Sequence, residues 1–208
     1  RYLVDGNRDF LLDMLPDLDS EYHAWESDHR LSSGLFWQHD VRDGMEEQIS
    51  GGRRVRNARP TINSYMYGNA LALSWIAEMA GEEQLAEKYT AKADTLRLLV
   101  EEKLWNPESG FYETLKENGE FAEAREAIGY IPWYFMLPAP GHEGAWEQVT
   151  DPGGFLAPFG LTTAERRHPE FRSHGCCHCE WDGAVWPFAT SQTLTAMANV
   201  LNSDRAAP

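Results

Sequence analysis

The sequence has few basic residues, no long apolar run and no dispersed cysteines, and each absence argues against a class of protein. No apolar stretch approaches the roughly 20 residues that a membrane-spanning helix needs, so we expect no membrane partner. Only 18 Lys and Arg residues stand against 33 Asp and Glu, which gives a net charge of −15. Nucleic acids and anionic membrane surfaces are therefore not expected as partners, because both require clustered basic side chains.

The three cysteines lie within four positions, inside the segment His174–Glu180, which excludes a spread-out disulfide framework. Cys176 and Cys179, with the histidines beside them, are zinc-type ligands. A structural zinc site needs a second ligand pair from a distant segment, and no second cysteine pair exists. A zinc site with His142 or His168 as a further ligand remains an alternative. We predict no metal and no cofactor, and interpret the segment as a loop that faces a cleft.

The chain does not begin with Met, contains no signal peptide and opens inside an apolar-periodic segment. We therefore expect an excised piece of a longer protein, folded as a single domain over residues 1–208, and its compartment is left open. Aromatic residues are abundant, with eight Trp, eight Tyr and nine Phe. Such residues fill large cores or line carbohydrate clefts.

Apolar periodicity predicts a fold made of helices. Helices are expected over residues 11–25, 60–80, 83–104, 123–137, 143–149 and 186–201. Gly81 closes the second helix and leaves so short a connection that the second and third must form an antiparallel hairpin. The apolar face expected for the last helix is Phe188, Leu194, Met197 and Leu201. A small β-hairpin is expected over 111–120 and irregular chain over 151–183. No series of strands supports a core sheet, so the fold class is all-α.

The segment from Gly34 to Glu47 combines acidic and aromatic residues. Its acidic and imidazole side chains are His39, Asp40, Asp43, Glu46 and Glu47. Only Arg42 balances them, and Phe36 and Trp37 lie beside them. A sugar ring offers a C–H face to an aromatic ring, and a glycosidic oxygen needs a proton from a carboxylic acid, so the segment suits sugar chemistry. An acidic turn that caps the next helix is the alternative interpretation.

Five motifs follow one another along the whole chain. They are an Asn-containing helix start (Pro60–Tyr67), a Leu-Trp-Asn turn that ends in Gly-Phe-Tyr (Leu104–Tyr112), Gly-Tyr-Ile-Pro (Gly129–Pro132), Phe-Gly-Leu-Thr (Phe159–Thr162) and Trp-x-Gly-x-x-Trp (Trp181–Trp186). Together they resemble the six-hairpin (α/α)6-barrel glycoside hydrolases, in the branch that holds mannosylglycerate hydrolase, trehalase and the processing α-glucosidases. The resemblance implies an (α/α)6 toroid, of which this chain is an incomplete part, with long irregular cleft loops.

The resemblance also implies two catalytic carboxylates and hydrolysis of an α-linked glycosidic bond with inversion. In that family the general acid lies in a Gly-x-Asp-Asn motif just before the Asn-containing helix. The matching residues here are Gly44–Glu47, which makes Glu46 the expected acid. Glutamate in place of aspartate moves the proton donor, so Asp43 is the fallback. The second carboxylate of the family lies downstream of the Trp-x-Gly-x-x-Trp segment, and we expect it beyond Pro208.

A carbohydrate is the expected partner, and several residues are candidates for contacting it. The candidate substrate-binding residues are Trp37, Gln38, Asn63, Tyr65, Trp181, Gly183 and Trp186. Each tryptophan is equally compatible with a place in the core, and an Asn at a helix start commonly serves as a cap. Arg59 is a candidate for holding a carboxylate on a charged aglycone. The alternative to an enzyme is a non-catalytic carbohydrate-binding α/α domain.

Overall fold

The computed structural model describes residues 2–175 and 178–203, and helices dominate it. The α-helices are α1 (Tyr2–Asp5), α2 (Arg8–His29), α3 (Pro60–Ala80), α4 (Glu83–Leu104), α5 (Ile131–Tyr134), α6 (Glu147–Thr150) and α7 (Pro187–Leu201). Short 3-10 turns cover Asp40–Arg42, Ala127–Tyr130 and Glu143–Trp146. Two antiparallel strand pairs complete the described part: β1 (Trp105–Asn106) with β2 (Phe111–Tyr112), and β3 (Leu156–Ala157) with β4 (Gly160–Leu161). None of the described helices combines the length and apolarity of a membrane span.

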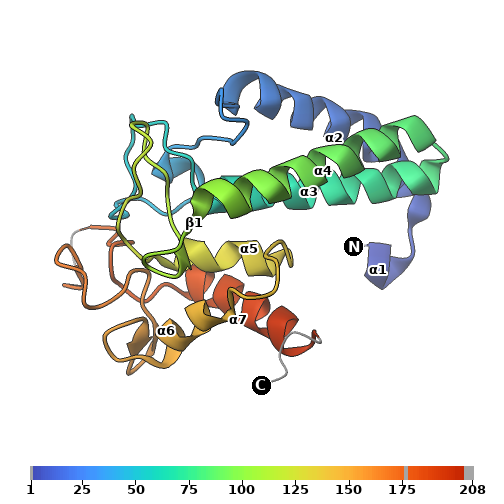
Figure 1. Ribbon diagram of the computed structural model, residues 1–208. Coiled ribbons are helices and arrows are strands. Elements are labelled where there is room, and N and C mark those ends of the chain that lie inside the picture. Colours follow the sequence, from blue (N-terminus) through green and yellow to red (C-terminus); the bar gives the residue numbers. More distant parts are fainter. Residues whose placement is uncertain (1, 176–177, 204–208) are drawn as a thin grey trace.

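Helices α3 and α4 form the expected hairpin, and they lie side by side along their whole length (Figure 1). Pro60 occupies the first turn of α3, where its missing N–H leaves no hydrogen bond unmade. Gly81 ends the helix in the left-handed conformation, with φ of 80°, and its N–H bonds to the carbonyls of Ala77 and Glu78. Both helices were predicted from the sequence, and the structure confirms them.

Helix α2 packs on the same hairpin. The side chain of Asn7 caps its first turn by accepting the N–H of Phe10 at 3.1 Å. Pro16 lies inside the helix without ending it. Tyr22 meets Tyr89 of α4 edge to face, at 5.1 Å between ring centroids. Of the apolar stripe expected for this helix, Leu15 and Tyr22 are buried, and the others are partly buried against the same core: Leu11, Leu18 and Trp25.

The expected helix over 123–137 is wrong in extent, since helical geometry covers only 127–134. Glu123 has a left-handed φ of 58°, and Glu126 is extended and pairs with Ala164 in an antiparallel bridge. Gly129 packs directly on the ring of Phe111 and the carbonyl of Tyr112, where any side chain would collide. The segment is therefore fixed by neighbours far along the chain, which local periodicity does not encode.

The apolar face expected for α7 is also wrong. Its buried residues are Ala189, Thr193, Ala196 and Val200, which are small enough for α5 to pack closely against it. Phe188, Leu194 and Leu201 are 48%, 52% and 65% exposed. The expected β-hairpin is confirmed only at its turn. Leu115 bridges Phe121 around that turn, whereas β2 pairs with the residues that precede it.

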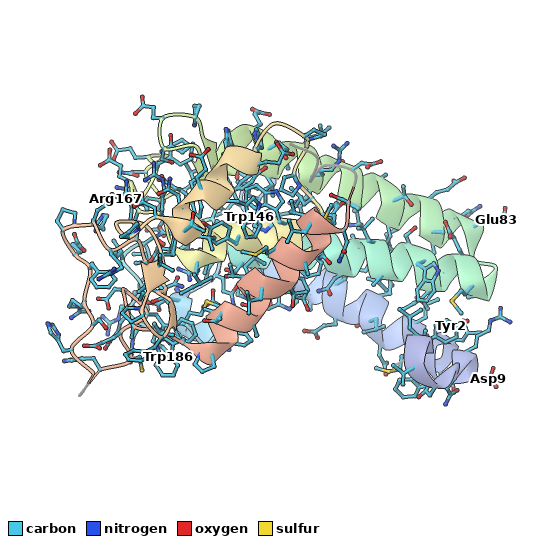
Figure 2. All side chains as sticks on the ribbon, turned by 90° about the horizontal axis from the view of Figure 1, so that it is seen from below. Tyr2, Asp9, Glu83, Trp146, Arg167 and Trp186 are labelled. Atoms are coloured by element: carbon cyan, nitrogen blue, oxygen red, sulfur yellow. The ribbon has the colours of Figure 1, made fainter. Side chains whose placement is uncertain are left out.

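The long connections gather at one end of the molecule, where α3 begins and α4 ends (Figure 1). In Figure 2, Trp186 and Arg167 lie at this end, whereas Tyr2 and Glu83 lie at the other. Isolated antiparallel bridges join Trp37 to Ala58 and Ala58 to Leu115, so three segments from two connections are held edge to edge. The acidic segment from Gly34 to Glu47 lies at this end of the molecule.

Candidate active site

The segment from Asp43 to Ser50, here called the acid loop, is held in place through several of its side chains. The Oδ2 atom of Asp43 accepts hydrogen bonds from Arg59 Nη2 at 3.0 Å and from Thr61 Oγ1 at 2.9 Å. The Oε1 atom of Gln48 accepts a further hydrogen bond from Arg59 Nη2. Ser50 bonds to Glu126, which lies 76 positions away in the chain. Contacts on both sides therefore fix the path of the acid loop.

Arg59 bonds to two residues of the acid loop, and only 1% of its surface is exposed. Its Nε and Nη2 atoms bond to Asp43 and Gln48, whereas its buried Nη1 meets no hydrogen-bond partner among the described residues. The expectation that Arg59 binds a charged aglycone stays a prediction. Burial raises the pKa of Asp43, and the nearby Arg59 charge and the Thr61 hydroxyl oppose that rise. A salt bridge this deep fixes geometry, because either charge left without its partner would be unsolvated.

Glu46 differs from its neighbours on the acid loop. It is partly exposed, and its carboxylate makes no hydrogen bond or ion pair with the residues that the structure describes. Asp43, Glu47, Gln48 and Ser50 all engage other segments. Glu46 is thus the carboxylic acid of the acid loop with neither oxygen bonded to a described residue, whereas Asp43 leaves only its buried Oδ1 without a partner.

The other side of the acid loop contacts the segment just before Trp181. Glu47 and Glu180 both have left-handed backbones, with φ of 66° and 50°, which costs free energy for residues other than glycine. Glu47 accepts the N–H of Glu180 at 3.4 Å and bonds to His178 Nδ1 at 3.3 Å. Although desolvation opposes it, these partners lower the pKa of Glu47. The N–H groups of Gly175 and then His174 lower the pKa of Glu180.

Trp181 and Trp186 stack face to face, with 4.9 Å between ring centroids and an interplanar angle of 3°. Trp181 is buried, whereas Trp186 is partly exposed and donates its Nε1–H to the carbonyl of Cys179 at 2.9 Å. A Cβ atom on Gly183 would lie 2.1 Å from the carbonyl oxygen of Arg172. Gly183 therefore permits a close approach of two segments of this chain.

Three other candidates lie within the framework. Trp37 is buried between the imidazoles of His29 and His39, at 4.4 and 5.0 Å between ring centroids. Gln38 next to it is buried, and its Oε1 finds no hydrogen-bond partner among the described residues. The side chain of Asn63 is fully buried. It accepts the N–H of Phe36 at 2.8 Å and donates to the carbonyls of Phe36 and Arg59 at 2.9 and 2.8 Å.

Tyr65 lies within electrostatic reach of Asp43, and its hydroxyl accepts a hydrogen bond from Gln192 Nε2 of α7 at 2.6 Å. Burial raises the pKa of this hydroxyl. The Oε1 atom of Gln192 is buried and meets no partner within the described residues. Asp43 and Tyr65 therefore lie near each other, close to the N-terminal part of α7. Trp37 and Asn63 instead hold the connection before α3 in place.

Glu126 is a buried carboxyl that sequence reasoning missed. The Ser50 hydroxyl bonds both Glu126 and Thr114 Oγ1, the latter at 2.9 Å, and the N–H groups of Ile49 and Ser50 also point to Glu126. Burial raises the pKa of Glu126 to about 7, against the lowering influence of Ser50 and Arg59. No local pattern marks this residue, because its partners lie in distant segments.

Replacing Glu126 with glutamine is expected to flatten the pH dependence of folding stability. The folded protein retains a proton on Glu126 up to about pH 7, whereas the unfolded chain releases it near the usual pKa of 4.5. The proton held by Glu126 therefore stabilises the folded state. This contribution is fully present below about pH 4.5, and about 3 kcal/mol of it is lost as the pH rises through 7. Glutamine mimics the neutral acid, so urea unfolding of Glu126→Gln from pH 4 to 8 should lack that decline. Glu87→Gln, an exposed site on α4, is the control. An unchanged decline in the Glu126 variant would refute the neutral carboxyl.

Within residues 2–175 and 178–203, no group of three or more His, Cys, Asp or Glu side chains is arranged to hold a metal ion. Cys176 and Cys177 lie outside the described residues, so the structure does not test the zinc alternative. Cys179 is a free, exposed cysteine.

Antiparallel helical pairs that carry an acid-bearing loop just ahead of a long helix are the architecture of the (α/α)6 glycoside hydrolases. Residues 1–208 match the family model described as the mannosylglycerate hydrolase MGH1-like glycoside hydrolase domain. The chain belongs to this family.

Comparison with solved structures supports the same fold. A chain described as a sialidase superposes with a TM-score of 0.94 at 60% sequence identity, over 98% of this chain and 19% of its own length. GH63 mannosylglycerate hydrolase from Thermus thermophilus, in complex with glucose, gives a TM-score of 0.79 at 16% identity, over 97% of this chain and 59% of its own. Neutral trehalase Nth1 from Saccharomyces cerevisiae gives a TM-score of 0.57 at 13% sequence identity, over 69% of this chain and 28% of its own length. This chain therefore spans only part of each larger relative.

Proposed function

We propose that this chain carries the acid side of an inverting glycoside hydrolase active site, with Glu46 as the general acid. The observation that carries the proposal is the position of Glu46, the carboxylic acid left unpaired on a loop whose other side chains are engaged. A proton donor must be free to reach the glycosidic oxygen, and a rigid loop keeps it in place while the bond breaks. The family of the chain supports the reaction class.

The chemistry follows from two opposed carboxyl groups. Glu46 delivers its proton to the leaving oxygen, while a carboxylate about 6.5–9.5 Å away deprotonates a water molecule on the opposite face of the sugar. The water attacks the anomeric carbon as the glycosidic bond breaks, so the product appears with inverted configuration. We place this second carboxylate outside residues 1–208. Asp43 remains the alternative acid, but its Oδ2 is already committed to Arg59 and Thr61.

For the substrate we propose a carbohydrate with an α-linked bond, contacted from the partly exposed side of Trp186 and from Tyr65. Trp181 lies behind Trp186 and fixes its plane. Gly183 acts indirectly, by letting the segment at Arg172 pack against the motif. The acid-bearing connection is supported by three buried residues, Trp37, Gln38 and Asn63. A sugar could contact them only by reaching their buried polar atoms.

We also propose that residues 1–208 are a single domain that forms part of a toroid. The thermophilic mannosylglycerate hydrolase extends beyond the region that this chain covers. Apolar side chains that remain exposed on α3 and α7 mark the faces that further helices would cover. These side chains are Leu71, Trp75, Phe188, Leu194 and Leu201.

The direct test follows proton NMR of α-linked disaccharides and glycosyl-glycerates mixed with the full-length polypeptide that contains this chain. Initial appearance of the opposite anomer is the expected result. Initial appearance of the same anomer would contradict inversion while leaving hydrolysis intact. If ligands shift on binding but none is cleaved, the non-catalytic carbohydrate-binding alternative takes the place of the proposal.

A further inference from the structure

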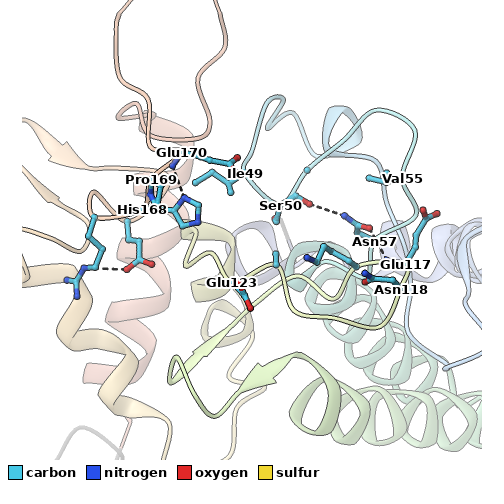
Figure 3. A pocket seen from close by; sticks show the side chains of 15 residues that line it. Ile49, Ser50, Val55, Asn57, Glu117, Asn118, Glu123, His168, Pro169 and Glu170 are labelled. Atoms are coloured by element: carbon cyan, nitrogen blue, oxygen red, sulfur yellow. Dashed lines mark hydrogen bonds and ion pairs between the residues drawn. The ribbon is translucent and has the colours of Figure 1, made fainter.

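A cavity of about 890 Å³ opens at the end of the molecule that carries the acid loop. Figure 3 shows its walls, which come from three connections: residues 49–57, residues 116–123 after β2, and residues 165–170. Ligand-binding pockets in proteins usually measure about 300–1,000 Å³, so the space is large enough for more than one sugar ring.

The acid loop runs directly into one wall of the cavity. Gln48 points to the buried Arg59, whereas the next residues, Ile49 and Ser50, line the cavity. None of the candidate catalytic or sugar-contacting residues lines it. One short piece of chain therefore carries Glu46 and, from Ile49 on, forms a wall of the cavity.

The wall beside the acid loop is rigid. Asn57 donates to the carbonyl of Ser50 at 3.0 Å and accepts the N–H of Glu117 at 3.2 Å, which joins two of the three connections. Ser50 is tied in turn to Glu126. A wall that is already hydrogen-bonded loses little freedom when a ligand binds, which favours affinity.

Several groups on the other walls remain available to a ligand. His168 uses Nδ1 to accept the N–H of Glu170 at 3.1 Å, which leaves Nε2 free. The carboxylates of Glu123 and Glu170 make no hydrogen bond or ion pair with the described part of the chain. The cavity thus offers donors and acceptors together, beside the apolar walls of Val55 and Pro169. Sugar hydroxyls both donate and accept, and sugar C–H faces pack on apolar surface.

Charge restricts the ligand further. Four carboxylates line the cavity, against the two basic side chains of Lys116 and Arg167. Arg167 is already paired with Asp151 and lies 3.5 Å from Glu165.

Lys116 lies 4.0 Å from Glu120, outside the lining, and among the described lining residues it is the one cation that an anionic sugar could reach. Such a sugar would also meet the unpaired carboxylates of Glu123 and Glu170, so the excess of negative charge selects against sialic and uronic acids.

We propose that this cavity binds uncharged sugar units on the leaving-group side of an extended glycan. The side of the bond rests on the proposed function, because a general acid protonates the leaving oxygen and the acid-bearing loop runs directly into the cavity wall. The active site would thus act at a terminal bond, while the cavity recognises the residues that remain after cleavage.

The test uses the full-length polypeptide and saturation-transfer NMR with a ladder of neutral α-linked oligosaccharides, from one to four units, and a sialylated tetrasaccharide. The double variant His168→Ala/Glu170→Ala should weaken binding of the neutral tri- and tetrasaccharides about tenfold, since two hydrogen bonds are lost. Monosaccharide binding should not change. Glu87→Gln, at an exposed position on α4, is the control for loss of an acidic charge. A second variant, Val55→Trp, fills the cavity from one wall and should have the same effect by exclusion.

The outcomes separate the two proposals. If the polypeptide cleaves glycans and neither variant changes the affinity or KM of the longer ones, the cavity proposal is overturned and the hydrolase stands. If nothing is cleaved but both variants weaken binding of the longer glycans, the cavity is a carbohydrate site and the hydrolase is overturned. Equal affinity for the sialylated tetrasaccharide would overturn the selection for uncharged units.

Discussion

Replacing Glu46 with glutamine in the full-length polypeptide should lower kcat by about 10²–10⁴-fold, which is the usual contribution of a positioned general acid. The amide keeps the shape of the side chain but has no proton to give to the leaving oxygen. Glu46 pairs with none of the described residues, so the loss of its charge should leave the braces of the acid loop intact. Affinity for the substrate should therefore change little, and the effect should appear in kcat.

The leaving group provides the control for this experiment. A substrate whose leaving group departs without a proton, such as a glycosyl fluoride, should lose much less rate than a disaccharide in Glu46→Gln. Asp43→Asn tests the fallback acid in parallel, with circular dichroism to show that it still folds. If Glu46→Gln keeps full activity on disaccharides while a folded Asp43→Asn loses it, the assignment moves to Asp43.

Replacing Arg59 with methionine should destabilise the protein by about 3–5 kcal/mol, the usual effect of removing one member of a buried ion pair. The substitution keeps the apolar bulk but leaves Asp43 buried without its cation and removes the hydrogen bond to Gln48. The measurement is urea unfolding followed by tryptophan fluorescence. Arg54→Met is the matched control, because Arg54 is exposed and makes no ion pair with a described residue.

A double variant identifies the cause of that loss. Asp43→Asn combined with Arg59→Met removes the uncompensated charge, so it should be more stable than Arg59→Met alone. If the two losses simply add, the salt bridge has no coupling energy and the acid loop is held by its other contacts. This result would also weaken the account of how Glu46 is positioned.

The long helices could be predicted because their signals are local. Pro60 and Gly81 mark the two ends of α3, and the apolar stripe between them has helical spacing. The five motifs likewise lie in short segments, which is why the sequence alone pointed to the (α/α)6 family. Glu46 was assigned by the same kind of inference, from a short motif upstream of α3, and it stays a prediction.

Pairing between distant segments was not predictable from the sequence. Ser50 and Glu126 are 76 positions apart, and nothing near either residue announces the other. The buried side of α7 was missed for a related reason. Its large side chains suggested a core face, but close packing on α5 selects the small residues instead. Periodicity finds a stripe on a helix, and only the neighbouring elements decide which stripe is covered.

Asn63 has a consequence for the length that the connection before α3 can take. Its side chain binds both backbone groups of Phe36 and the carbonyl of Arg59, and the bridge from Trp37 to Ala58 lies just inside these contacts. The two ends of the acid-bearing connection are thus joined through one residue of α3. Changing the length of a connection whose ends are already joined adds little to the entropy lost on folding. The connection should therefore tolerate insertions between these joined ends at little cost in stability, provided that the contacts of the acid loop are kept.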